Sequence, residues 1–382
     1  MNSSSPHPTP DRPVADKFAG LLDMGFERVD PAPITTESIR VDAGTHKVSQ
    51  VRPAMGSFVT ISVLHQSEAL AEDAVGKAFE EMDRVVAVLN RFDGSSALTY
   101  LNDTGGIDSA PPELTWVVGG ALDYHRLTGG AFDVTVKPII DLFRDPQTYE
   151  PRTPPSAAEL SEARALVGAE HIGMDGRDLS LSRSGMGLTL DGIAKGYIVD
   201  AMADALLAQG ATRFLINAGG DIRAAGDRGD ELPWTIAIRD PEDAAPSWDS
   251  ESWRRSVVPD LIRITDGAVA TSGSYEVYFD RQRLAHHIVQ GQTGRSPDHA
   301  MSVTVTATTA MEADALATAV FVLGPGQGVR LINGLDGCEC LIIDRQGKQV
   351  RSHGWSAIAA AAGEPGRWAG GAETEANGRR DV

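Results

Sequence analysis

The sequence predicts an α+β fold, in which strands and helices are interleaved without the regular rhythm of a parallel sheet. Two patterns indicate this: β-branched segments with alternating apolar residues, and longer segments in which apolar residues recur every three to four positions. Composition agrees, because 42% of the 382 residues are hydrophobic. That is enough for a sizeable core, so a chain disordered throughout is excluded.

Four segments have the alternation of half-buried strands, with β-branched residues at many positions. They are Met55–Val63, Thr212–Asn217, Trp234–Arg239 and Met301–Ala307.

Four other segments have the spacing of amphipathic helices, and residues typical of helix ends flank several of them. A long helix is predicted from Glu68 to Asn90 with Ser67 as its N-cap. Further helices are predicted at Thr115–Leu127, at Gly196–Gln209 before Gly210, and at Ala313–Leu323 before Gly324.

These elements define one domain with an extension at each end. We expect residues 1–49 to be a disordered or poorly defined extension, 50–363 a single domain, and 364–382 a disordered tail. The stretches 144–158 and 240–256 are predicted as loops, and the role of the second, a possible insertion, is open.

Net charge argues against a nucleic-acid partner, and the N-terminal sequence favours a cytoplasmic location. The chain carries 34 basic and 53 acidic residues, a net charge of −19, which disfavours nucleic acid. No apolar run reaches the roughly 18 residues of a membrane span. The N-terminus lacks the apolar core of a secretory signal and a cysteine for a lipid anchor, so we expect a cytoplasmic protein. Cys338 and Cys340 are expected to be small core residues.

The glycine motifs of the common nucleotide-binding folds are missing, yet two segments could bind an anion. Gly219 and Gly220 in Asn217–Asp221 could offer backbone N–H groups to a ligand, although a tight turn explains them better in isolation. Lys195 opens a predicted helix, where it could contact a phosphate or carboxylate or simply be solvated.

Three further segments carry groups with possible chemistry. Phe132 and Asp133 could lie beside a ring ligand, or mark a helix-to-strand turn with a core phenylalanine. Asp314 and Thr318 lie four residues apart on a predicted helix, so their oxygens could bind Mg²⁺ or serve only the helix. His286 and His287 precede a Gly-rich turn, where one could be a general base although most histidines are structural.

Taken in order, these segments resemble the FAD:protein FMN transferase (ApbE) family, over roughly residues 50–345. The shared motifs are Met55–Phe58, Leu89–Asp93 with Ser96–Asn102, Gly130–Thr135, Gly192–Tyr197, Asn217–Ile222, Ala270–Tyr275, His287–Ile288 with Thr293–Gly294, and Ala313–Ala319 with Phe321–Gly324. The resemblance implies a T-fold-like architecture of mixed antiparallel sheets with packed helices. It also implies an enzyme that moves FMN from FAD to a Ser or Thr hydroxyl of a target flavoprotein, using Mg²⁺ and releasing AMP.

The resemblance further implies roles for individual residues. Met55, Phe92 and Phe132 would flank the flavin or adenine. The polar parts of FAD would be held by Asp133, Lys195, Asn217, Gly219, Gly220, Asp221 and Ser272. Asp314, Thr318 and a backbone carbonyl near Gly192 would bind the metal. His287 would take the proton from the incoming hydroxyl, and Lys195 would neutralise developing charge.

One motif departs from the family pattern. The family usually continues its histidine with Ile-Ile-Asp-Pro, whereas this chain has Ile288, Val289, Gln290 and Gly291. Two alternatives therefore stay open: an FAD pyrophosphatase that yields FMN and AMP, and a non-catalytic FAD-binding protein.

Overall fold

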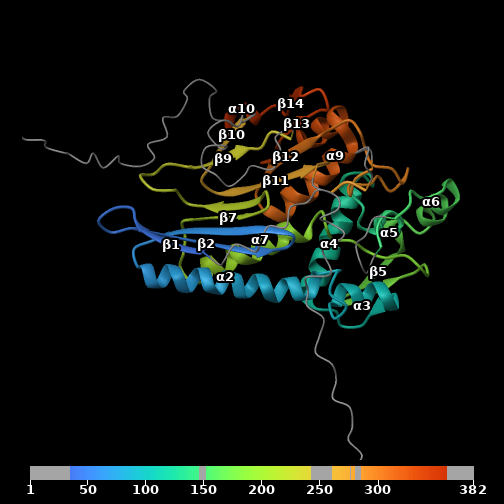
Figure 1. Ribbon diagram of the computed structural model, residues 1–382, viewed down its shortest axis with the longest axis horizontal. Helices are drawn as coiled ribbons and strands as arrows, with labels where there is room; N and C mark the ends of the chain where they lie inside the picture. Colours follow the sequence, from blue (N-terminus) through green and yellow to red (C-terminus); the bar gives the residue numbers. More distant parts are fainter. Residues whose placement is uncertain (1–34, 146–151, 242–259, 276, 280–284, 359–382) are drawn as a thin grey trace, which may run out of the picture.

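The computed structural model describes residues 35–145, 152–241, 260–275, 277–279 and 285–358 (Figure 1). Part of the predicted loop at 144–158 and most of the segment at 240–256 lie outside the described residues, as do both ends of the chain.

Within the described residues, a nine-stranded antiparallel sheet forms the centre of the fold, in the order β1-β2-β3-β7-β8-β11-β12-β13-β14. The strands are β1 (Thr35–Arg40), β2 (His46–Ala54), β3 (Ser57–His65), β7 (Phe214–Ala218), β8 (Asp221–Ala225), β11 (Gly267–Gly273), β12 (Ser302–Ala307), β13 (Glu339–Ile343) and β14 (Gln349–Arg351). Smaller sheets combine β4 (Gly106–Ile107), β6 (Asp178–Leu181) and β5 (Ile172–Asp175), and β9 (Trp234–Ile238) with β10 (Asp260–Ile264).

The helices are α2 (Glu68–Leu89), α3 (Ala97–Thr104), α4 (Pro112–Leu127), α5 (Lys137–Phe143), α6 (Ala157–Arg164), α7 (Ala194–Ala208), α9 (Ala310–Ile332) and α10 (Trp355–Ile358), with short 3₁₀ turns η2 (Val134–Val136) and η3 (Ala169–His171). Helices α2, α7 and α9 cover one face of the large sheet, whereas α10 packs against β10 and β13 on the other face. Helices α2 and α7 run along the sheet, and α9 packs against α7 (Figure 1). The predicted α+β class is therefore confirmed.

The two faces of the sheet enter two different cores. On β13, Cys340 and Ile342 point into the large core beneath the helices, whereas Leu341 and Ile343 face the small core. This alternation follows from the two-residue period of a strand. The small core is closed by β9, β10 and the buried Trp355 of α10. Both cysteines are buried in the large core, as the sequence predicted.

Most predicted elements occur with shifted ends. Ser67 caps α2, its hydroxyl accepting the backbone N–H of Leu70 at 3.4 Å. The predicted strand at Met55–Val63 begins later, because the chain turns at Met55 and Gly56, which both have positive φ angles. The large sheet also begins at Thr35, before the residue 50 that we expected, because β1 pairs with β2.

The predicted helix end at Gly324 is confirmed. Helix α9 spans Ala310–Ile332, but its backbone is non-helical at Gly324, whose φ and ψ are 75° and 175°, so one helical segment ends there and a second begins at Pro325. Pro325 lacks the N–H that the Phe321 carbonyl would accept in a regular helix. Nε2 of His299 lies 2.8 Å from that carbonyl oxygen and donates to it instead.

Among the described residues, α9 is long and apolar enough to cross a membrane by length and composition alone. It lies in the protein core, however, with Leu316, Val320 and Phe321 fully buried. A buried helix of this composition is expected in the core of a folded domain.

Candidate functional site

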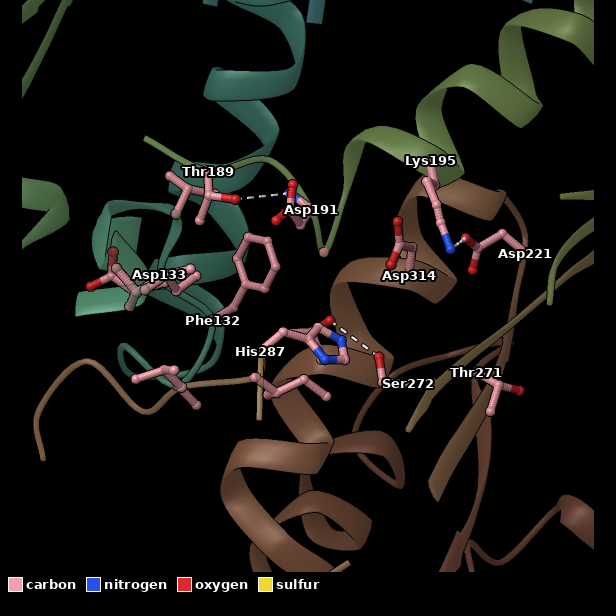
Figure 2. A pocket seen from close by; sticks show the side chains of 18 residues that line it. Phe132, Asp133, Thr189, Asp191, Lys195, Asp221, Thr271, Ser272, His287 and Asp314 are labelled. Atoms are coloured by element: carbon pink, nitrogen blue, oxygen red, sulfur yellow. Dashed lines mark hydrogen bonds and ion pairs between the residues drawn. The ribbon is translucent and has the colours of Figure 1, made fainter. Parts of the chain in front are cut away.

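A pocket opens where the first turn of α7 and the second and third turns of α9 meet the ends of β8 and β11 and two loops (Figure 2). Its empty volume is about 690 Å³, including the part open to solvent. Nine of the residues selected from the sequence line it: Phe132, Asp133, Gly192, Lys195, Asp221, Ser272, His287, Asp314 and Thr318.

Backbone contact between α7 and α9 brings Asp314 to this pocket. A Cβ atom on Gly196 would lie 2.3 Å from the Ala310 carbonyl oxygen, so the crossing tolerates only glycine. The N–H of Gly196 donates to Oδ2 of Asp314 at 3.1 Å. Asp314 is 6% exposed and lines the pocket, so α9 presents a nearly buried carboxylate at the N-terminal end of α7.

Lys195 reaches the pocket from the first turn of α7. Its Nζ lies 3.1 Å from Oδ2 of Asp221, the first residue of β8. The Asp221 side chain is 4% exposed and the Lys195 side chain 28%. Figure 2 shows Lys195 and Asp314 around the same opening as the His287 ring. A basic side chain here is well placed to meet an anionic ligand.

Hard oxygen donors gather on the α9 side of the pocket. Oγ of Ser272 lies 3.2 Å from Oγ1 of Thr318. A Cβ on Gly192 would lie 2.8 Å from that same threonine oxygen, so the backbone of Gly192 passes directly beside it. A carboxylate, a hydroxyl and backbone oxygens suit Mg²⁺ chemically.

The residues present therefore fit such an ion. The described part of the chain has no cluster of three or more His, Cys, Asp or Glu side chains that could hold a metal. A cation here would need further oxygens from a bound substrate molecule. That agrees with the usual binding of Mg²⁺ by one or two carboxylates together with substrate phosphates.

His287 lies on the opposite side of the pocket from α7. Burial lowers the pKa of its imidazole to about 4, and the cationic Lys195 and Arg91 act in the same direction. The Val277 carbonyl and Asp191 oppose this shift. The imidazole is therefore neutral at pH 7 and able to accept a proton. His286 is fully buried, with Nε2 2.9 Å from the Pro297 carbonyl oxygen, so the structure distinguishes the two histidines.

Phe132 and Asp133 form another part of the lining. Phe132 is 2% exposed and belongs to the core, as one of the two interpretations expected. The chain continues into η2 and α5 instead of the expected strand, because Asp133 caps η2 by accepting the Thr135 N–H at 2.8 Å. Burial raises the pKa of Asp133, and the hydrogen bonds from Thr135 oppose this.

The sequence did not single out three other lining residues, Thr189, Asp191 and Thr271. Arg91 makes two hydrogen bonds to Asp191, at 2.9 and 2.7 Å. Asp191 directly precedes one family motif and Thr271 lies within another, so the sequence did carry a signal for both residues. It carried no signal for the pairing of Asp191 with Arg91, which lies 100 positions earlier.

The remaining selected residues lie outside the pocket lining. Asn217, Gly219 and Gly220 form the β7–β8 turn, in which Oδ1 of Asn217 accepts the Gly220 N–H at 3.0 Å. A Cβ on Gly219 would lie 2.6 Å from the Ser57 Oγ, so this turn adjoins the one that contains Met55. Phe92 is 57% exposed, with its ring 4.4 Å from the Arg91 guanidinium.

The loop that departs from the family pattern closes on itself. The Gln290 N–H donates to the Arg295 carbonyl at 3.0 Å, and the Gln290 carbonyl accepts from Gly294 at 2.8 Å. Its side-chain oxygen accepts the Thr293 hydroxyl at 3.0 Å. Gln290 thus supplies an oxygen acceptor where the family usually has a carboxylate.

Fold and pocket together define an α+β protein with a polar ligand site between the N-terminus of α7 and the second and third turns of α9. A model of the ApbE family matches residues 55–342, about three quarters of the chain. This chain belongs to the ApbE family.

Curated relatives carry a specific name. The FAD:protein FMN transferase of Vibrio cholerae is 32% identical over 283 residues, which cover 72% of this chain and 81% of the relative. That of Escherichia coli K12 is 28% identical, covering 89% of this chain and 94% of the relative.

Solved structures show the same fold. The ApbE protein of Thermotoga maritima is similar with a TM-score of 0.71 at 28% identity, covering 85% of this chain and 99% of that one. The flavin transferase ApbE of Vibrio cholerae gives 0.67 at 30% identity, covering 85% and 100%.

Proposed function

We propose that this protein transfers FMN from FAD to a Ser or Thr hydroxyl of an acceptor flavoprotein, with Mg²⁺ and with release of AMP. The observation that carries the proposal is the convergence of Asp314, Thr318, Lys195 and His287 on one pocket. The names of the relatives support the same reaction.

The pocket supplies what a phosphoryl transfer needs. FAD would lie with its diphosphate near Lys195, and with a ring against Phe132. Asp314, Thr318 and the Gly192 backbone would hold Mg²⁺, which when bound stabilises negative charge on the diphosphate oxygens. Lys195 would add a second positive charge to offset the chain's net charge of −19.

His287 would act on the incoming hydroxyl, which is a weak nucleophile by itself. The hydroxyl oxygen forms a bond to the phosphorus of the FMN half, and its proton passes to the neutral imidazole. The bond from that phosphorus to the bridging oxygen breaks, and AMP leaves with the bridging oxygen. The product is a phosphoester of FMN on the acceptor side chain.

The test is to incubate the protein with FAD, Mg²⁺ and a flavoprotein domain that accepts FMN on a threonine, prepared without flavin. We expect mass spectrometry to find FMN covalently bound to that threonine, with one AMP released per adduct. The matched control is the same acceptor with its threonine changed to valine.

Other outcomes would contradict the proposal. Free FMN and AMP without an adduct would indicate an FAD pyrophosphatase, with water replacing the hydroxyl. Tight FAD binding without AMP release, indifferent to Mg²⁺, would indicate a binding protein without turnover.

A further inference from the structure

Where helices α7 and α9 cross, a carboxylate of each accepts backbone N–H groups at the start of the other. Asp314 of α9 accepts the N–H of Gly196, in the first turn of α7. Asp200 of α7 accepts the N–H groups of Ala310 and Met311, the first residues of α9, at 2.9 and 2.8 Å. Each helix therefore supplies a side-chain acceptor for backbone donors at the start of the other.

These hydrogen bonds use donors that a helix leaves unpaired in its first turn. Helix α7 has no side-chain cap of its own, since Ile193 stands at its N-cap position. Asp314 thus caps α7 from outside while lining the pocket. Helix α9 has a cap of its own in Thr309, whose hydroxyl accepts the Glu312 N–H at 3.2 Å. Asp200 is consequently not needed merely to begin α9.

We call the hydrogen bonds that Asp314 and Asp200 accept the α7–α9 tie. Gly196 and Asp200 are four residues apart on α7, and Ala310 and Asp314 are four apart on α9, so each pair shares one helix face. The Gly196 backbone touches that of Ala310 between the two sets of hydrogen bonds. Rotation or sliding of α9 would break both sets together.

Strand β8 joins the α7–α9 tie. Nε of Arg223 lies 3.6 Å from Oδ1 of Asp200, and its Nη1 donates to the Thr308 carbonyl at 2.6 Å. Asp221, two residues earlier on the same face of β8, pairs with Lys195. Asp200 therefore lies on the opposite side of the α7–α9 crossing from the pocket. It belongs to the helix that carries Lys195 and is hydrogen-bonded to α9, which carries Asp314 and Thr318.

We propose that Asp200 is a positioning residue for the cation site. By holding the start of α9 against α7, it fixes Asp314 and Thr318 relative to the Gly192 backbone. This inference rests on the proposed function for the identity of the cation, and it assigns Asp200 no contact with ligand.

The experiment measures cation binding directly. Mn²⁺ is titrated into the full-length protein with saturating FAD, and free Mn²⁺ is followed by electron paramagnetic resonance against an FAD-only baseline. The variants are Asp200→Ala and Asp200→Asn, with Thr309→Ala as the matched control. Thr309→Ala weakens the same helix end but leaves the α7–α9 tie intact. Circular dichroism fixes a temperature at which every variant is folded.

We expect the Mn²⁺ dissociation constant to rise about tenfold or more in Asp200→Ala, the range found when a group that orients a metal ligand is removed. The Mn²⁺ dissociation constant of Asp200→Asn, which keeps one acceptor oxygen, should rise by less. Thr309→Ala should stay within about twofold of the unaltered protein, although its unfolding temperature falls. If Asp200→Ala does not fold, Asp200→Asn carries the comparison.

Three results would overturn the inference: unaltered Mn²⁺ binding by folded Asp200 variants, an equal weakening in Thr309→Ala, or no Mn²⁺ binding by the unaltered protein. Failure of the proposed function looks different. It would appear as Mn²⁺ binding that depends on Asp200 in a protein that transfers no FMN to any acceptor.

Discussion

The two sides of the pocket are built in different ways. On one side, which we call the helix wall, Lys195, Ser272, Asp314 and Thr318 stand on α7, α9 and β11, and backbone atoms of the two helices touch at Gly196. On the other, the loop wall, Phe132, Asp133 and His287 stand on connecting segments. There Asp133 is held by Thr135 only two residues away, and Nδ1 of His287 lies 3.4 Å from the Val277 carbonyl oxygen.

This difference suggests a division of labour. A cation and a diphosphate need donors fixed in position, and regular elements locked by backbone contacts supply them. Recognition of a ring and transfer of a proton tolerate adjustment when the ligand binds, which loops allow. Changes in the helix wall should therefore act through cation binding, whereas changes in the loop wall should act through ligand affinity or proton transfer.

The largest effect is expected from Asp314→Asn in the helix wall. The amide oxygen can still accept the Gly196 N–H, so the fold should survive, but the charge that would hold the cation is lost. We expect FMN transfer at saturating FAD to fall by about 1000-fold, as for loss of a main electrostatic group. The assay is the initial rate of acceptor labelling across a Mg²⁺ titration. Near-normal rates in a folded variant would remove Asp314 from the cation site.

His287→Asn tests the loop wall. Without the imidazole the acceptor hydroxyl loses its base, and we expect kcat to fall by about 100-fold or more, with little change in Mg²⁺ half-saturation. Rates at saturating FAD and acceptor measure the first quantity, and a Mg²⁺ titration the second. A large shift in Mg²⁺ dependence instead would place His287 in the cation site and break the contrast between the walls.

The pH dependence of the unaltered protein sharpens this assignment. The pKa of His287 is lowered to about 4, so the imidazole loses its proton-accepting form only as pH falls toward 4, not near 6.5. We expect transfer activity to be insensitive to His287 titration between about pH 5.5 and 8. Stability should fall as pH drops from about 6.5 toward 4, because in that window only the unfolded histidine takes a proton. Rate and unfolding profiles check both, and an acid limb near 6.5 in kcat contradicts the assignment.

A smaller effect is expected from Thr135→Val beneath Asp133. The hydroxyl of this fully buried threonine donates to Asp133 and accepts the Gly168 N–H at 2.8 Å. Its loss should lower the free energy of unfolding by about 1–3 kcal/mol and weaken FAD binding by about tenfold. Denaturant unfolding and fluorescence titration with FAD measure the two, with Thr135→Ser as the control. Unchanged FAD affinity would show that Asp133 does not contact the ligand.

The smallest effect is expected from Ser272→Ala. Its hydroxyl lies beside that of Thr318, and the Thr318 side chain should stay in position without it because α9 holds it. Removing it should raise the Mg²⁺ half-saturation by about threefold, the effect of one neutral hydrogen bond. A loss as large as that of Asp314→Asn would mean that Ser272 itself binds the cation.

Much of the fold and many of the pocket residues could be predicted from the sequence. Periodicity placed α2, α7 and the strands β7 and β12 within a few residues, because an amphipathic pattern and its end residues act locally. The motif order singled out nine residues that line one pocket. The end of a helical segment at Gly324 was also predicted, but not the second segment that begins at Pro325 and continues to Ile332.

Only the tertiary structure decided which of these residues meet. The local pattern of the sequence could not place the Asp314 carboxylate beside Gly196, 118 residues away, because that contact depends on how α7 and α9 cross. The local pattern did not separate His287 from His286, and only the family resemblance selected His287; in the structure His286 is fully buried and His287 lines the pocket. The sequence by itself determined the elements, through patterns that repeat every two or 3.6 residues. Packing decided which side chains share the pocket, because burial and proximity depend on residues far apart along the chain.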